Sequence, residues 1–244
     1  MNKYDDPMFF NKYKEMARSQ EGLTAAGEWS NLKTMLPDFQ GKRVLDIGCG
    51  YGWLCMYAIE QGASSVVGID SSHKMLQVAE EKKKAMVDGD KIVYKHMTIE
   101  DMVFAEQSFD VVLSSLALHY TASFEDVMDK IARYLCKGGD VVLSVEHPIF
   151  TAYGTGDWIY NNDGQPDHWP VDLYFEQGPR HTQFLGCSVI KYHKTLTTYV
   201  NGLIRDGRFQ LTKLIEPLPE QEMLASMPDE ARRPMMLLMA AKRI

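Results

Sequence analysis

Three closely spaced glycines and two carboxylates form the part of the sequence most suited to binding chemistry. Gly48, Gly50 and Gly52 follow an apolar run, and glycines at such a point let the backbone turn sharply and come close to a ligand. Asp46 precedes them, and Asp70 ends the next apolar run. Carboxylates at this edge repel a pyrophosphate and attract an ammonium or sulfonium group. The pattern therefore predicts a site for a cationic nucleoside.

A dinucleotide site is the main alternative for such a glycine turn, and the spacing argues against it. The dinucleotide pattern is G-x-G-x-x-G, with the pyrophosphate at the helix N-terminus. Here the third glycine comes one residue early, and Trp53 occupies the expected position. Dinucleotide-binding folds place an acidic residue at the end of the second strand, where its carboxylate can accept hydrogen bonds from both ribose hydroxyls. Asp70 is expected to have the same role here. A dehydrogenase is disfavoured.

Candidate proton acceptors stand where a later apolar run ends. Glu146 and His147 follow residues 140–145, and His147 has the best placement for a general base, since histidine titrates near neutrality. Its alternative role is to hydrogen-bond the backbone of the following segment. His193 is a third catalytic candidate, with helix capping or anchoring as its alternative. No cluster of residues is predicted to hold a metal.

Regular alternation of apolar runs and helical patterns positions these residues. Runs at 43–47, 65–70, 91–96, 109–114 and 140–146 predict strands, and helices are expected at 53–60, after Ser71 or Ser72, and at 124–135. Continuous apolar strands separated by helices indicate parallel strands that are buried on both faces. The fold class is therefore α/β, with a doubly wound sheet of about seven strands whose carboxyl ends carry the site.

Other segments are expected to cover the site. Two helices, Phe9–Arg18 and Ala26–Met35, precede the first strand, and residues 148–180 form a long ordered insertion without helical period. Gln183–His193 is predicted to be one strand, and Gly138–Gly139 the turn before residues 140–146. A helix at Thr195–Ile204 and strands at Arg208–Glu216 and Met235–Lys242 complete the chain.

Residues 44–52 read V-L-D-I-G-C-G-Y-G, which resembles the first motif, D-x-G-x-G-x-G, of the class I S-adenosylmethionine-dependent methyltransferases. The resemblance extends over about Val44 to Glu146 and is closest to small-molecule enzymes of the ubiquinone-biosynthesis type. It implies S-adenosylmethionine as the cofactor. It also implies strand order 3-2-1-4-5-7-6 with strand 7 antiparallel, N-terminal helices, and an insertion after strand 5 that forms a lid.

The resemblance also assigns residues to parts of the cofactor. Contacts to the cofactor would come from four places. These are the glycine turn with Asp46, the ribose position with its neighbours, the adenine position after strand three and the methionine position after strand four. These residues are Asp46, Gly48, Gly50, Gly52, Asp70, Ser71, Met75, Ile99, Glu100, Ser114, Leu116 and His119. Near the N-terminus, Tyr4, Phe9 and Tyr13 are expected to close over the cofactor, and Arg18 to pair with its carboxylate.

The length of 244 residues suits one methyltransferase domain. Its predicted parts are an N-terminal helical cover (1–40), a cofactor-binding core (41–146), a lid that contacts the substrate (147–193) and the C-terminal end of the sheet (194–244). Aromatic side chains of the lid either wall a pocket for a flat or apolar acceptor or pack the insertion onto the sheet.

Composition narrows the function classes. The formal net charge of −7 provides no general basic field for nucleic acid, and no run of about 18 apolar residues predicts a membrane span. Four scattered cysteines predict reduced thiols and a cytoplasmic protein. The leading hypothesis is methyl transfer to O, N or C of a small molecule. A cofactor-binding protein without turnover is the alternative, with nucleic-acid methylation less favoured. No pattern indicates an oligomeric state.

Overall fold

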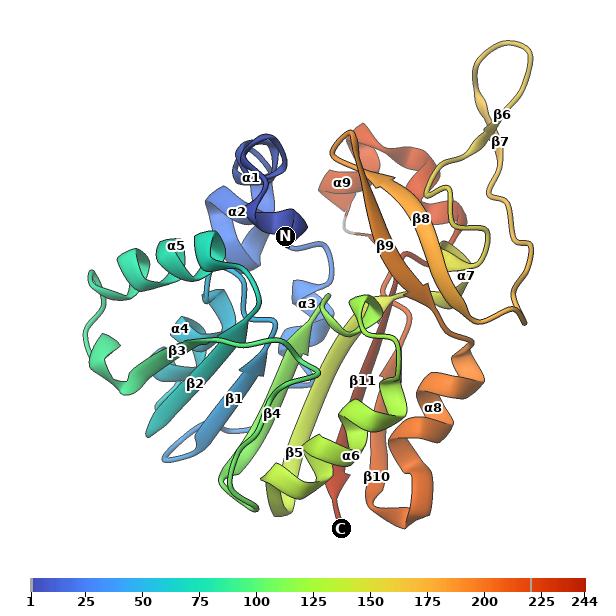
Figure 1. The fold of residues 1–244 in the computed structure, drawn as a ribbon. Helices are drawn as coiled ribbons and strands as arrows, with labels where there is room; N and C mark the ends of the chain where they lie inside the picture. The colour runs from blue at the N-terminus through green and yellow to red at the C-terminus, as the bar shows by residue number, and fades with distance from the viewer. Residues whose placement is uncertain (1, 220) are drawn as a thin grey trace.

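A computed structural model describes residues 2–219 and 221–244. Seven strands form one sheet in the order β3-β2-β1-β4-β5-β11-β10 (Figure 1). All neighbours pair in parallel except β11, which is antiparallel to β5 and β10. The predicted doubly wound sheet, with strand order 3-2-1-4-5-7-6 and an antiparallel seventh strand, is confirmed. The strands are β1 Arg43–Ile47, β2 Ser65–Asp70, β3 Ile92–His96, β4 Phe109–Ser115, β5 Leu135–Glu146, β10 Phe209–Ile215 and β11 Met236–Arg243.

Helices cover both faces of this sheet. Helices α6 (Phe124–Tyr134) and α8 (Leu196–Ile204) pack on one face, whereas α3 (Trp29–Lys33), α4 (Trp53–Glu60) and α5 (His73–Lys83) lie on the other. Successive side chains of a strand point to opposite faces, so both faces must be apolar. This is why the strands read as continuous apolar runs. Within the described ranges, no helix has the length and apolarity that a bilayer crossing requires.

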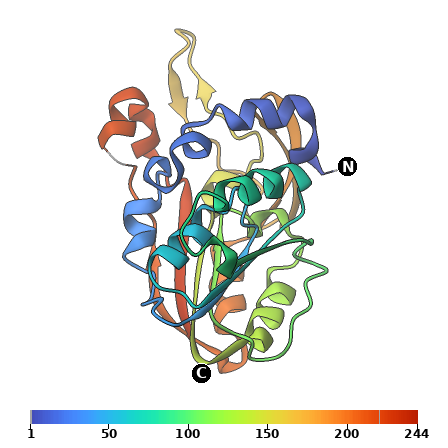
Figure 2. The ribbon, with the colours of Figure 1, turned by 90° about the vertical axis from the view of Figure 1, so that its left-hand side faces the viewer.

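Two segments lie over the carboxyl ends of the parallel strands. One is the N-terminal segment, residues 2–28, with η1 (Lys3–Asp5), α1 (Pro7–Lys14), α2 (Ala17–Glu21) and η2 (Gly22–Ala25). The other is the hairpin of β8 (Gly178–Phe184) and β9 (Cys187–His193). Figures 1 and 2 show both at the same end of the sheet, together with the protruding β6–β7 hairpin. We call the N-terminal segment and the β8–β9 hairpin the roof.

The N-terminal helices differ from the prediction. The single helix predicted at Phe9–Arg18 is wrong, because extended backbone at Met16, with ψ of 141°, separates α1 from α2. The break lets Phe9 bury against the β8–β9 hairpin while Arg18 reaches Glu28. The helix predicted at Ala26–Met35 is reduced to the short α3. Met1 and Glu220, which belong to the predicted parts 1–40 and 194–244, lie outside the described residues.

The region after β5 also differs from the prediction. Residues 183–193 do not form one strand, because the chain reverses at Leu185 and Gly186, whose φ angles are 53° and 71°. Positive φ at two adjacent residues is the backbone of a tight hairpin turn. The hairpin pairs with itself and stays outside the main sheet. The preceding insertion is ordered as α7 (Pro148–Thr151), β6 (Ile159–Tyr160) and β7 (Pro166–His168). Gly138–Gly139, predicted as a turn, lie within β5.

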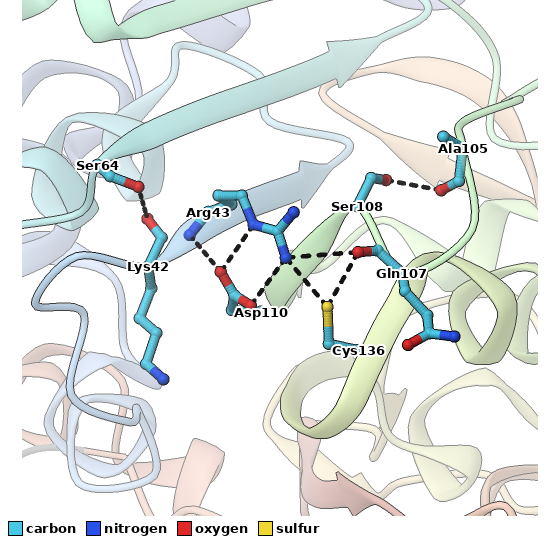
Figure 3. A network of polar contacts seen from close by, with 8 residues as sticks. All are labelled: Lys42, Arg43, Ser64, Ala105, Gln107, Ser108, Asp110 and Cys136. Carbon is cyan, nitrogen blue, oxygen red and sulfur yellow. Dashed lines mark hydrogen bonds and ion pairs between the residues drawn. The ribbon is translucent and has the colours of Figure 1, made fainter.

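An ion-pair network ties the strands together at the end opposite the roof (Figure 3). Arg43, at the start of β1, donates from Nε and from its terminal nitrogen to the two carboxylate oxygens of Asp110 in β4, each at 3.0 Å. The same guanidinium donates to Sγ of Cys136, whose thiol donates to the carbonyl of Gln107. Strands β1, β4 and β5 are therefore fixed to one another away from the candidate site.

Candidate functional site

A cavity of about 540 Å³ lies between the carboxyl ends of the strands and the roof. Residues of β1, β2, β4 and β5 form its floor, and residues of the N-terminal segment and of the β8–β9 hairpin cover it. Ten of the residues predicted to act at the site line this one cavity. They are Asp46, Gly48, Gly50, Asp70, Ser71, Met75, Ile99, Leu116, His119 and Glu146.

The glycine turn is shaped by close contacts beneath the cavity. A Cβ atom at Gly48, where φ is 73°, would overlap the side chain of Ala117, so the turn can pass over β4 only with glycine. A Cβ at Gly52 would overlap the Tyr94 hydroxyl on the side away from the cavity. A Cβ at Gly50 would meet nothing within 4 Å. The glycines therefore hold the turn tight against its supports and leave open space on the cavity side.

Asp70 is fixed at the end of β2 by two backbone donors. Its Oδ2 accepts from the amide of Gly50 at 2.9 Å, and its Oδ1 accepts from the amide of Ser72 at 2.8 Å. Burial raises the pKa of this carboxyl. Each carboxylate oxygen can accept more than one hydrogen bond, so both retain capacity toward the cavity. This geometry suits a pair of neighbouring hydroxyl groups.

Asp46 is a buried carboxyl with one oxygen unpaired. The thiol of Cys55 donates to its Oδ2 at 3.2 Å, while Oδ1 has no partner among the described residues. Burial raises the pKa of Asp46 to about 7. Leaving a buried carboxylate oxygen without a donor is costly, unless a ligand supplies one. Asp46 is therefore suited to an ammonium or another cationic donor.

Arg18 reaches the cavity from the N-terminal segment and is held by two groups. It donates to Oε1 of Glu28 at 2.7 Å and to Oγ of Ser115 at 2.8 Å. Ser115 in turn donates to the same Glu28 oxygen at 3.0 Å. Glu28 is only 1% exposed. The guanidinium is therefore fixed at the end of β4 and neutralised by a buried carboxylate.

Glu146 lies at the end of β5 beside a lysine from the roof. Its Oε1 accepts from Nζ of Lys191 at 2.5 Å, whereas its buried Oε2 has no partner in the described part of the chain. The amide of Glu146 donates to Nδ1 of His119 at 3.3 Å, and burial lowers the pKa of that imidazole to about 4. His119 is therefore neutral near pH 7, and Glu146 is the carboxyl group at this end of the cavity.

Three tyrosine rings line the cavity. The ring of Tyr4 lies 5.4 Å from that of Tyr13 and 6.1 Å from that of Tyr120, with interplanar angles of 79° and 88°. The hydroxyls of Tyr4 and Tyr120 lie 3.0 Å apart, within hydrogen-bond distance. This contact joins the N-terminal segment to the segment that follows β4.

The other five of the fifteen residues predicted to bind the cofactor or act in catalysis do not line the cavity, and neither does Phe9, which packs against the β8–β9 hairpin. Both ring nitrogens of His147 are engaged, Nδ1 by the amide of Ile149 and Nε2 by Glu216. His193 is held by Thr151 and the carbonyl of Tyr174. Both histidines therefore take the alternative roles of capping and anchoring. The remaining three are Gly52, which faces Tyr94, Ser114, which donates to the Ile47 carbonyl, and Glu100, whose carbonyl accepts from Lys130.

The residues not predicted from the sequence include Tyr120, which lines the cavity, and Lys191 and Glu28, which pair with cavity side chains. Tyr120 directly follows His119 and could have been included with it. Lys191 had a usable signal, because Cys187, Val189 and Lys191 alternate on the buried side of β9. A lysine on an apolar face requires a carboxylate nearby. Glu28 carried no comparable signal, since nothing in its local sequence indicates burial.

Known proteins resemble this chain along nearly its whole length. A family model for a methyltransferase domain matches residues 45–143. The structure of a candidate S-adenosylmethionine-dependent methyltransferase from Listeria monocytogenes is 49% identical, with a TM-score of 0.82 over 90% of this chain and 99% of that one. An S-adenosylmethionine-dependent methyltransferase from Mesorhizobium loti is 38% identical, with a TM-score of 0.80 over 91% and 100%. An uncharacterised Haemophilus influenzae protein is 33% identical over 99% and 96%.

Relatives that match a smaller part of the chain are named for different acceptor molecules. A ubiquinone biosynthesis O-methyltransferase of Mesorhizobium japonicum is 34% identical over 48% of this chain and 45% of its own length. A tRNA U34 carboxymethyltransferase of Hahella chejuensis is 32% identical over 66% and 45%. The chain thus spans about half the length of these relatives.

Proposed function

The chain belongs to the S-adenosylmethionine-dependent methyltransferases, and from this premise we propose that it transfers the methyl group to a small-molecule acceptor. The observation that carries the proposal is the covered cavity. The floor residues that suit the nucleoside and the carboxylate of Glu146 line one space of about 540 Å³ beneath the roof. A volume in the range typical of small-ligand sites favours an acceptor that enters whole.

The residues present fit the cofactor. Asp70 would hold the two ribose hydroxyls, with Ser71 and Met75 beside it, and Ile99 lies where the adenine is expected. The unpaired oxygen of Asp46 would accept from the ammonium of the methionine part. Arg18 would face its carboxylate. The two opposite charges of the methionine part, both on its α-carbon, would thus meet a buried carboxyl and a partly buried guanidinium.

The chain's own residues would contribute alignment, water exclusion and proton removal. Bound S-adenosylmethionine supplies an electrophilic methyl group on a sulfonium. Holding two reactants in line, in a site closed to water, can lower a barrier by about 7–11 kcal/mol. Glu146 lies at the acceptor end with a free Oε2, and there it would take the proton of an O–H or N–H acceptor. His119, neutral and 4.0 Å from Glu146, would help to hold that carboxylate in place.

Incubation with S-adenosylmethionine labelled on the methyl group tests the function. Purified protein is added to a cell extract that has been separated into small molecules, RNA and protein. We expect label to accumulate in the small-molecule fraction. Asp70→Asn should reduce transfer and weaken cofactor binding by about 1.5–3 kcal/mol, measured by calorimetry, because it removes a charged hydrogen-bond acceptor.

The exposed carboxylate Asp90 provides the matched control, since Asp90→Asn leaves the cavity unchanged. Label that enters RNA or protein instead would contradict the small-molecule acceptor. Binding of the cofactor without transfer to any fraction would favour a binding protein without turnover.

A further inference from the structure

The basic and acidic side chains that line the cavity differ in number and in how they are paired. Two basic side chains line it, and both are already paired: Lys3 with Asp6 at 3.6 Å and Arg18 with Glu28 at 2.7 Å. Among the described residues, no lining cation remains to bind a negatively charged acceptor. An acceptor whose reacting end is a carboxylate or a phosphate would therefore be repelled.

Three carboxyl groups line the same cavity: Asp46, Asp70 and Glu146. Lys191, at 2.5 Å from Glu146, neutralises one of the three charges when all are ionised. S-adenosylmethionine has one net positive charge, which balances a second. One negative charge is left over in this count, and an anionic acceptor would increase the excess. An acceptor that brings one positive charge balances it.

Glu146 shows where that charge would bind. Lys191 occupies its Oε1, while Oε2 is buried and without a partner in the described ranges. A hydrogen bond from a cationic N–H donor to such an oxygen is about twice as strong as one between neutral groups. The site therefore favours an ammonium over a hydroxyl at this position.

Tyrosine rings provide the second element of a cation site. Tyr120 directly follows His119, whose ring accepts from the Glu146 amide, and the Tyr4 hydroxyl contacts that of Tyr120 at 3.0 Å. The ring of Tyr4 is nearly perpendicular to those of Tyr13 and Tyr120, with centroids 5.4 and 6.1 Å away. Rings arranged in this way form walls in more than one direction. Aromatic faces attract alkylammonium groups, by about 2 kcal/mol or more when water is excluded.

We propose that the acceptor is a small amine, bound as an ammonium ion beside Glu146 and facing the rings of Tyr120 and Tyr4. The inference rests on the proposed methyl transfer and narrows its acceptor atom to nitrogen. The ammonium first gives one proton to Oε2 of Glu146, which frees the nitrogen lone pair. The nitrogen then forms a bond to the methyl carbon while the carbon–sulfur bond breaks, and that electron pair stays on the sulfur of the departing thioether. The products are a methylated ammonium ion, neutral S-adenosylhomocysteine and protonated Glu146.

Three probes of similar shape and different charge test the amine site: benzylamine, benzyl alcohol and benzoate. Each is titrated into the full chain saturated with sinefungin, an unreactive analogue that carries an ammonium in place of the sulfonium. We expect benzylamine to bind at least about tenfold more tightly than benzyl alcohol, and benzoate to bind weakest.

Variants separate the two elements of the site. Glu146→Gln keeps the size of the side chain and should remove the preference for the amine while sinefungin still binds. Tyr4→Phe retains the ring and should keep the preference, whereas Tyr4→Leu should reduce it. Equal or tighter binding of benzyl alcohol or benzoate, or no binding of any probe to the sinefungin complex, would overturn the amine assignment alone. Failure of sinefungin itself to bind would overturn the methyl-transfer function as well.

Discussion

At the scale of single residues, Asp46 couples cofactor binding to pH. Its carboxyl is buried, its pKa is raised to about 7, and its Oδ1 faces no donor in the described ranges. A protonated Asp46 cannot pair with the ammonium of the cofactor. Binding therefore requires the ionised form, which is lost as the pH falls through about 7.

We predict that cofactor affinity decreases by up to about tenfold per pH unit below pH 7 and levels off above it. Asp46→Asn should weaken binding and flatten this profile. Calorimetry with S-adenosylhomocysteine, from about pH 6 to about pH 8, measures both. The ligand-free chain should show the opposite trend, because a raised carboxyl pKa makes the folded state bind its proton more tightly than the unfolded state. Its stability should fall as the pH rises from about 4 to about 7. Equal pH profiles for the two proteins would contradict the role of Asp46.

Glu146 and His147 are adjacent in the chain, but only Glu146 is expected to affect turnover strongly. Glu146→Gln should reduce kcat by about 10²–10⁴, the usual contribution of a general base, with little change in cofactor affinity. His147→Asn is the matched control, since asparagine is also a good N-cap for the short helix α7 and His147 does not line the cavity. Steady-state kinetics should show near-normal turnover for this variant. A greater loss of turnover in His147→Asn than in Glu146→Gln would restore the histidine as the base.

At the scale of secondary-structure elements, the Arg43–Asp110 pair fixes β1 to β4 at the end far from the cavity (Figure 3). The hydrogen bonds from Arg43 lower the pKa of Asp110 to about 2. A lowered carboxyl pKa stabilises the fold above the unfolded value near 3.9, and this contribution is lost as the pH falls through about 2.

Asp110→Asn should reduce the free energy of unfolding by about 1 kcal/mol at neutral pH, since both side chains are partly exposed and solvent screens the pair. The difference from the unaltered chain should disappear near pH 2. Urea denaturation measures both values, and cofactor affinity serves as the control because it should not change. Equal stability of the two proteins at neutral pH would show that the network contributes nothing.

The elements also show what local sequence can predict. The strands and helices at 43–146 were predicted nearly as observed, because the central strands are buried on both faces and their own residues reveal this. The break at Met16 and the turn at Leu185–Gly186 depend on distant contacts, such as Phe9 against the β8–β9 hairpin. Leu185 is an unusual residue at positive φ, so the turn had no local signal.

At the scale of the whole molecule, the residues at the strand ends could be predicted from the sequence, whereas those placed by the roof could not. The residues at the strand ends, such as Asp46, Asp70 and Glu146, could be located from the order of strands, since carboxyl ends of parallel strands meet at one edge. Lys191 and Glu28 meet the cavity residues Glu146 and Arg18 only through the arrangement of the roof, which no local sequence period describes. His147 was placed correctly along the chain, but Glu216 and Ile149 hold its ring outside the cavity.

Adjacent residues of the N-terminal segment make two separate contacts with the strand ends: Asp5 accepts from Ser72 at 2.7 Å near the ribose position, and the hydroxyl of Tyr4 meets that of Tyr120 at 3.0 Å. Lifting this short segment from the sheet would break both contacts together. The cover over Ser72 and the cover over Tyr120 therefore cannot be removed independently of each other.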